Sequence, residues 1–213
     1  MKWRIFQLIK SFIILILLFN TNNLFAQIGE VIKYKGSSSI LNGSHKLDDP
    51  KEGLKISNDT SILTFDNTYV TIELKNPLSY IKIGSESKVS IKYEPSQKAY
   101  YLTLHKGYIK TLFKQSSMAF KMFVMTSNAK IELKENKMIA IYSPLIQRTS
   151  ILNIKGPAIF YKKNQIGEET MLENMEYSYV EKYSDSPSSP TILSRVQQQE
   201  ILNSFKIKEN LKF

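Results

Sequence analysis

Short segments in which apolar and polar residues alternate run through the chain from Val31 to Tyr161. The stretch from Tyr69 to Leu74 is typical, because every second residue in it is a branched apolar one. Successive side chains of a β-strand point to opposite faces, so this period of two predicts strands with one buried face and one solvated face. No segment before residue 190 shows a long helical period, which argues against a helical body.

Turn signals separate the alternating segments at spacings near ten residues. They include Asn42-Gly43, Asp66-Asn67, Lys106-Gly107 and Gly156-Pro157. Such a series predicts an all-β fold of many short antiparallel strands, arranged as a sandwich or as a short solenoid-like stack. The strands are expected at 69–74, 81–83, 89–91, 101–104, 108–113, 120–124, 129–133, 138–142, 151–154 and 158–161.

The first 26 residues have the order of a secretory signal peptide. Basic residues come first, an eight-residue apolar run from Phe12 to Phe19 follows, and Ala26 stands before the expected cleavage point. A membrane-spanning helix needs roughly 20 apolar residues, so the run favours a cleaved leader over a retained anchor. Either alternative places the remaining chain outside the cytoplasm, in the periplasm or secreted, with no stable membrane span after cleavage.

Charge and cysteine content narrow the kinds of partner and site. Of the 29 Lys and Arg residues three lie in the leader, so the remaining 26 face 19 Asp and Glu, a formal net charge of +7. This balance favours anionic neighbours such as lipid headgroups or acidic glycans. The lysines are scattered at alternate strand positions, as Lys82, Lys88, Lys92 and Lys110 are, which is typical of a solvated sheet face and argues against nucleic acid. The chain has no cysteine, which excludes disulfides and thiolate metal sites.

The C-terminal part has a different composition. The β domain is expected to span residues 27–183, and residues 184–190 (SDSPSSP) have the composition of a linker. Residues 191–213 are expected to form a helix from Thr191 to Lys206, capped by Thr191 or Ser194, and a tail. Its short apolar stripe of Ile201, Leu202 and Phe205 can dock on the protein's own sheet or contact a partner.

The residue types that carry chemistry do not form a recognisable set. The two histidines, His45 and His105, flank predicted turns, and a metal site usually needs three or four converging ligands. No nucleophile elbow or phosphate-binding glycine loop is present. The glutamates that could pair as acid and base occupy polar strand positions or turns. We therefore expect no enzyme activity, no cofactor and no metal. These glutamates are Glu73, Glu86, Glu132, Glu135, Glu168, Glu169 and Glu173.

Tyrosines are the most suggestive residues for binding. Tyr177, Tyr179 and Tyr183 cluster shortly before the expected linker. Exposed aromatic rings can anchor a protein interface or stack on sugar rings, and they can equally cap a small core. We take these three tyrosines, together with Ile201, Leu202 and Phe205, as the candidate partner-binding residues.

A resemblance to a known family emerges from the order of several weak motifs. The region from about residue 29 to 162 resembles the FecR family of extracytoplasmic β domains. The matching segments are Gly29–Val31, Tyr34–Gly36, Leu54–Ile56, Asp59, Leu63-Thr64, Tyr69–Leu74, Ile81–Ile91, Leu102–Tyr108 and Phe123–Thr126 with Ala129. Where family members continue with a Gly-Thr turn, this chain has Leu133–Lys137 instead.

The resemblance implies a stand-alone member of the bacterial cell envelope. The best-known members carry a cytoplasmic anti-sigma segment and a membrane helix before this domain, and about ten residues cannot fold into such a segment. We expect a non-catalytic binding or scaffold module that docks to an envelope protein. The alternative is binding to peptidoglycan or an anionic polysaccharide through lysines and tyrosines.

Overall fold

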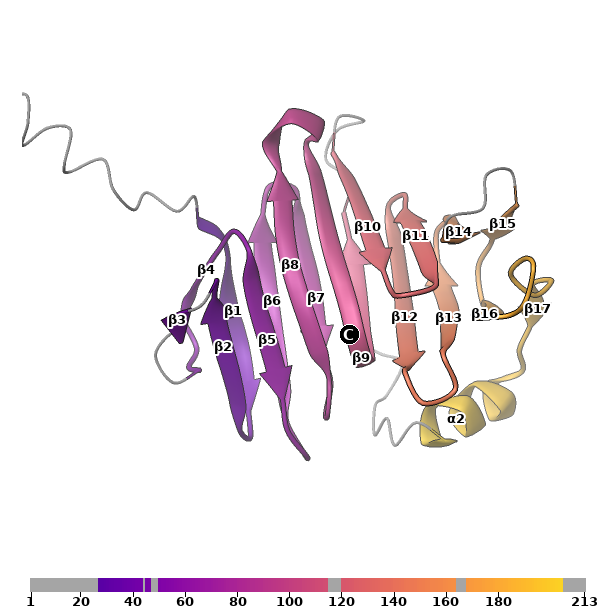
Figure 1. The fold of residues 1–213 in the computed structure, drawn as a ribbon, viewed down its shortest axis with the longest axis horizontal. Coiled ribbons are helices and arrows are strands. Elements are labelled where there is room, and N and C mark those ends of the chain that lie inside the picture. The colour runs from indigo at the N-terminus through magenta and orange to yellow at the C-terminus, as the bar shows by residue number, and fades with distance from the viewer. Residues whose placement is uncertain (1–26, 44, 47–49, 115–119, 164–167, 205–213) are drawn as a thin grey trace, which may run out of the picture.

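The computed structural model describes residues 27–43, 45–46, 50–114, 120–163 and 168–204. Within these residues 17 strands are joined in one hydrogen-bonded network. Their pairings divide into two sets that lie as two layers, with β2, β5 and β8 in front of β1, β6 and β7 in Figure 1. The all-β prediction is confirmed, and the two continuous layers correspond to an elongated sandwich. The predicted signal peptide lies outside the described residues.

The first layer, called layer A, is mainly antiparallel. Some of its adjacent strands, such as β1 and β6, are far apart in the sequence. Each strand in the following list is hydrogen-bonded to the next one. They are β4 (Lys55–Ser57), β1 (Gln27–Lys35), β6 (Tyr69–Lys75), β7 (Leu78–Ile83), the second part of β9 (Ala99–Phe113), β12 (Asn136–Ser143), β13 (Arg148–Lys155), β16 (Glu176–Glu181) and β17 (Thr191–Ile192).

Layer B lies on the other side of the core, and its strands are also hydrogen-bonded one to the next. One pair in it, β9 with β10, is parallel, whereas antiparallel strands were expected throughout. Its strands are β3 (His45–Lys46), β2 (Ser38–Asn42), β5 (Thr60–Thr64), β8 (Lys88–Glu94), the first part of β9, β10 (Lys121–Met125), β11 (Ala129–Leu133), β14 (Ala158–Lys162) and β15 (Glu169–Leu172). A single 3-10 turn, Pro95–Gln97, precedes β9.

Strand β9 connects the two layers. Its residues up to Lys106 pair with β8 in layer B, and its residues from Gly107 onward pair with β12 in layer A. The predicted turn at Lys106-Gly107 is therefore wrong, because the chain passes straight through as one strand. Gly107 has φ +86°, a conformation that glycine adopts without steric cost, and this lets the strand change layer.

The core between the layers follows the predicted alternation. Val70, Ile72 and Leu74 of β6 are all wholly buried, while Thr71 and Glu73 of the same strand are half-buried on the opposite face. The same cluster contains residues of β5, β8 and β11 from layer B. Burial of branched apolar side chains from both layers is what holds this cysteine-free chain together.

Three further sequence predictions differ from the structure. Strands β15 and β16 lie beyond Tyr161, where no strand was expected, because half-buried tyrosines and glutamates hide their period of two. Helix α2 (Arg195–Ser204) begins later than predicted, since Thr191 belongs to the short strand β17. The side chain of Lys110 is only 2% exposed, in register between Lys82 of β7 and Ile139 of β12, so it is not part of a solvated face.

Helix α2 covers part of the outer face of layer A. Ser194 caps it: its hydroxyl accepts a hydrogen bond from the Gln197 amide, and the Gln197 side chain accepts one from the Ser194 amide, at 3.3 and 2.9 Å. Leu202 is wholly buried in a second apolar cluster with Tyr108, Ile139 and Leu152. This packing favours the docked alternative for the helix.

Candidate functional site

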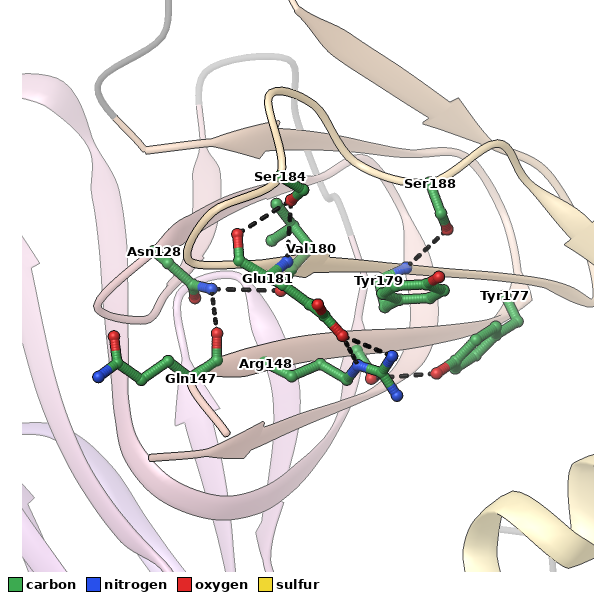
Figure 2. A network of polar contacts seen from close by, with 10 residues as sticks. Asn128, Gln147, Arg148, Tyr177, Tyr179, Val180, Glu181, Ser184 and Ser188 are labelled. Carbon is green, nitrogen blue, oxygen red and sulfur yellow. Dashed lines mark hydrogen bonds and ion pairs between the residues drawn. The ribbon is translucent and has the colours of Figure 1, made fainter. Parts of the chain in front are cut away.

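Two adjacent strands of layer A, β13 and β16, carry the most distinctive polar cluster. Their antiparallel register places Arg148 opposite Glu181 and Ser150 opposite Tyr179. Side chains two residues apart on a strand share a face, so Tyr177, Tyr179 and Glu181 lie on one side of β16. Figure 2 shows Arg148 and these three residues, which we call the tyrosine–arginine face.

Arg148 organises this face (Figure 2). Its Nη2 lies 2.6 Å from Oε1 of Glu181, and its Nε donates to the same oxygen at 2.9 Å. The guanidinium carbon lies 4.2 Å from the centre of the Tyr179 ring. An arginine that stacks on an aromatic ring while it forms a hydrogen bond and an ion pair with one carboxylate is held in one orientation, which preorganises the face for a partner.

The rings of Tyr177 and Tyr179 are neighbours, with centres 6.2 Å apart. The Tyr177 hydroxyl donates to Oγ of Ser150 at 3.1 Å, and its ring packs against the apolar cluster under α2. Both tyrosines are half-buried. The apolar bodies of these rings therefore support the core, and their remaining surface is open to solvent.

Residues 184–190 run beside β16. The Ser188 amide donates to the Tyr179 carbonyl at 2.8 Å, and the Tyr179 amide donates to the Ser188 hydroxyl at 3.1 Å. The Ser184 hydroxyl likewise accepts from the Glu181 amide, and Pro187 is buried. The segment that was expected to be a linker thus occupies the hydrogen-bonding edge of β16 and fixes the backbone below the tyrosines.

Large apolar side chains in the segment that borders the tyrosine–arginine face are exposed. Tyr183 is 87% exposed, Ile192 75% and Val196 68%. Exposed aromatic and branched side chains are typical of protein interaction sites, and Tyr183 follows the tyrosine–arginine face directly in the chain.

The structure separates the six predicted binding residues into different groups. Tyr183 is at the surface, Ile201 is half-buried and Leu202 is wholly buried. Tyr177 and Tyr179 come together with Arg148 as described above. Phe205 lies outside the described residues.

Sequence reasoning missed Arg148, Glu181 and the exposed Val196. A usable signal for Arg148 was its rarity, since Arg148 and Arg195 are the only arginines after the leader in a lysine-rich chain. Arginine is preferred to lysine where a planar group must stack and donate two hydrogen bonds at once. The pairing with Tyr179 had no sequence signal, because it depends on which strands are neighbours.

Among the candidate catalytic residues, Glu132 and Glu169 both lie near Tyr161, whose pKa is raised by burial and then by the charges of these two carboxylates. The glutamates considered as acid–base pairs are exposed or half-buried, and no three His, Asp or Glu side chains among the described residues gather to hold a metal. Partial burial, and secondarily the charge of Lys88, lowers the pKa of His105, whose Nε2 lies 3.0 Å from the Ser90 hydroxyl. His45 is exposed in β3.

The remaining tyrosines have structural contacts. Tyr93 and Tyr100 pack with ring centres 4.8 Å apart, and burial raises the pKa of Tyr100 to about 12. On layer B the Tyr101 and Phe123 rings stack at 5.2 Å, and the ammonium of Lys130 covers Phe123 at 4.4 Å. These ring faces are already occupied, which leaves little room for a sugar ring to stack on them.

Comparison with known proteins shows a likeness of fold. No family model and no curated protein matches the sequence. Two crystal structures, each described as a putative anti-sigma factor from Parabacteroides distasonis ATCC 8503, are similar to this chain, with TM-scores of 0.55 and 0.53 at 8% and 9% identity. Each alignment covers 67% of this chain, and 63% and 64% of the other chains, so the match spans just under two thirds of those proteins.

Across the described parts of the chain, no helix has both the length and the apolar character that crossing a bilayer requires.

Proposed function

We propose that this protein is a non-catalytic binding module of the bacterial cell envelope, exported by its leader, that docks to an envelope protein through the tyrosine–arginine face and the neighbouring Tyr183. The observation that carries the proposal is the fixed stack of Arg148 on Tyr179 beside the strongly exposed Tyr183. Tyr and Arg are the residues that most often dominate the energetics of protein interfaces.

The fold likeness supports the class of protein. The similar crystal structures are each described as a putative anti-sigma factor, a description that fits a binding protein better than an enzyme. The sequence resemblance to FecR-type domains points to the same class of envelope module. Residues 29–162 carry that resemblance, and they form most of the two-layer sandwich.

Charge around the face favours a protein over an anionic glycan. Residues 168–185 contain six acidic side chains and one lysine, although the mature chain as a whole is basic. This local excess of acidic residues disfavours a polyanion at this end of the sandwich. Peptidoglycan or polysaccharide binding through the scattered lysines is the second candidate function, and it would have to use another surface.

Site-specific photocrosslinking in the native envelope tests the docking proposal. A photoreactive phenylalanine analogue at position 183 should give one defined protein adduct on illumination. The same analogue at position 65 serves as the control, because Phe65 is also exposed but follows β5, many strands away from β16 in the sandwich. No adduct at 183 above the level at 65 would refute the docking surface.

A substitution at Arg148 tests whether the partner binds the tyrosine–arginine face or only lies near Tyr183. Arg148→Lys keeps the charge and can still pair with Glu181, but it lacks the planar guanidinium that stacks on Tyr179 while Nε donates a hydrogen bond to Glu181. We expect it to reduce the adduct at position 183 about tenfold, the effect of losing roughly 1.4 kcal/mol of binding energy. An adduct of undiminished yield would show that the face does not select the partner.

A further inference from the structure

Three pairs of lysines lie directly opposite each other on neighbouring strands. Two of the pairs belong to layer A, and the third joins β8 to β9 in layer B. Like charges placed opposite each other on a sheet repel, so an anion that lies between two such lysines relieves an unfavourable interaction. The pairs are Lys82 with Lys110, Lys137 with Lys155, and Lys88 with Lys106.

The pair in layer B is the one in which both lysines are exposed to solvent. Neither Lys88 nor Lys106 forms an ion pair with another residue in the described part of the chain. The neighbouring Val89 and Leu104 are wholly buried in the core. The two ammonium groups are therefore available to a ligand on the outer face of layer B.

An irregularity in the strand pairing brings a histidine to the same place. The register of β8 and β9 shifts here, because Val89 lies opposite Leu104 while Lys88 lies opposite Lys106. His105 is thus the extra residue of a β-bulge, and His105 and Lys106 are both exposed. Bulges redirect side chains and are frequent beside functional sites. This bulge adds an imidazole to the patch that carries the two ammonium groups.

A chain of hydrogen bonds crosses β5, β8 and β9 at this patch. Oγ of Ser61 lies 2.8 Å from Oγ of Ser90, which in turn lies 3.0 Å from Nε2 of His105. Partial burial lowers the pKa of His105, and the charge of Lys88 lowers it further, so Lys88 lies within electrostatic reach of the imidazole. We call Lys88, Lys106, His105 and Ser90 the phosphate site, for the ligand argued below.

Acidic neighbours confine the positive charge to a small area. Lys92, on the same face of β8, is already paired with Glu94 at 3.7 Å. Glu86 and Lys106 both line a cleft of about 430 Å³ beside Tyr108, so a carboxylate also stands at the other end of the site. An extended polyanion would meet both acids, whereas one compact anion between the opposing lysines would not.

We infer that Lys88 and Lys106 bind the phosphate group of a small soluble phosphate monoester. Such a group carries roughly −1.5 to −2 charges at neutral pH, which match the two ammonium groups. With Ser61 and Nε2 of His105 as donors to Ser90, the Ser90 hydroxyl donates its own proton to a phosphate oxygen. The inference is independent of the proposed envelope partner, which binds β13 and β16 in layer A.

An NMR titration of the full mature protein with glycerol phosphate tests the inference. The chain has only two histidines, so His45 serves as an internal reference for the imidazole signals. Chloride is exchanged for glycerol phosphate to keep the ionic strength constant. We expect the His105 signals to shift and saturate in the low millimolar range, while the His45 signals show no saturable shift. Equal shifts of both histidines, or no saturation at His105, would overturn the inference.

A pair of lysine substitutions on one strand separates a site from a general charge effect. Lys88→Gln should weaken the binding of glycerol phosphate about fivefold, the effect of losing one charge pair at the surface. Lys92→Gln is the matched control, because it removes the same charge from the same face of β8 at a lysine already paired with Glu94. It should change the affinity less than about twofold. Equal weakening by the two substitutions would contradict the site.

Vesicles that contain phosphatidic acid test the other source of a phosphate monoester. This lipid presents the same group on a membrane surface, whereas phosphatidylcholine does not. We expect Lys88→Gln to leave sedimentation with such vesicles unchanged, since the acids on either side of the site disfavour a surface of many negative charges. Sedimentation that depends on Lys88, together with no saturable shift of His105 by glycerol phosphate, would replace the soluble ligand with a lipid headgroup.

Discussion

At the residue scale, buried amides fasten the two layers to each other. Asn128 follows β10 in layer B, and its amide oxygen accepts hydrogen bonds from the hydroxyls of Thr149 and Thr126 at 2.6 and 3.1 Å. Its amide nitrogen donates to the carbonyls of Gln147 and Val180, in the neighbourhood of the tyrosine–arginine face (Figure 2). One side chain thus uses its hydrogen-bonding capacity to join β10, β13 and β16.

Asn128→Ala should lower the free energy of unfolding by about 3 kcal/mol, because it removes the amide donor of the Gln147 and Val180 carbonyls and the acceptor that the Thr126 and Thr149 hydroxyls share. Urea denaturation followed by tyrosine fluorescence measures this loss. Asn203→Ala, at an exposed position of α2, is the control and should cost less than about 0.5 kcal/mol. A small effect at Asn128 would mean that water replaces the amide there.

The surroundings of His105 predict the sign of one pH dependence of stability. Burial lowers the pKa of His105 in the folded state, so the unfolded chain takes up a proton first as pH falls. Stability should therefore decrease from about pH 7 to about pH 5, and His105→Gln should reduce that decrease. Thermal unfolding midpoints at the two pH values provide the measurement. His45→Gln, at an exposed position of β3, should keep the wild-type difference.

At the element scale, β9 decides the architecture. Its 15 residues contribute to both layers, and the change of layer occurs at Gly107. An added Cβ at Gly107 would lie 2.2 Å from the Ser87 hydroxyl oxygen and 2.6 Å from the Ser87 Cα. The crossing therefore depends both on the positive φ and on the close approach of β8's leading turn.

Gly107→Ala should destabilise the fold by more than about 3 kcal/mol, since backbone must move to admit the methyl group. Gly43→Ala is a matched control: Gly43 also has a positive φ, but an added Cβ there meets nothing within 4 Å. It should cost only about 1 kcal/mol for the left-handed conformation. Equal costs, measured as shifts of the urea midpoint, would show that the contact with Ser87 is unimportant.

The sequence anticipated elements more reliably than their connections. The predicted bounds of the strand at 129–133 match β11, and Ser194 was one of two predicted caps of the helix. Strands 101–104 and 108–113 were also identified, but the glycine between them was interpreted as a turn. Local pattern cannot distinguish a turn from a change of layer, because both use a glycine with positive φ.

At the scale of the whole molecule, charge is unevenly distributed along the sandwich. The acidic stretch 168–185 contains β15 and β16 at the C-terminal end of both layers, and the lysines belong mostly to the strands before it. The electrostatic potential near the tyrosine–arginine face is thus less positive than the potential over the rest of the surface.

This asymmetry predicts how salt acts on the two candidate functions. Capture of an envelope protein through aromatic contacts should persist at roughly 0.5 M salt, whereas attachment of the lysines to an anionic glycan should largely disappear. Crosslinking yield at position 183 and sedimentation with purified sacculi, both measured across the salt range, give the comparison. Sedimentation that disappears as salt rises, with no crosslink at position 183 at any salt concentration, would favour the glycan alternative.

The sequence by itself determined many of the strands up to Tyr161, and it determined which side of those strands faces the core. The reason is local: in a strand every second side chain points to the same face, so an alternating sequence shows which residues are buried. Only the tertiary structure decided that β9 crosses between layers, that Arg148 meets Tyr179, and that a cleft opens beside Tyr108. Those features depend on which distant strands become neighbours, and that choice follows from the packing of the whole core and not from any local pattern.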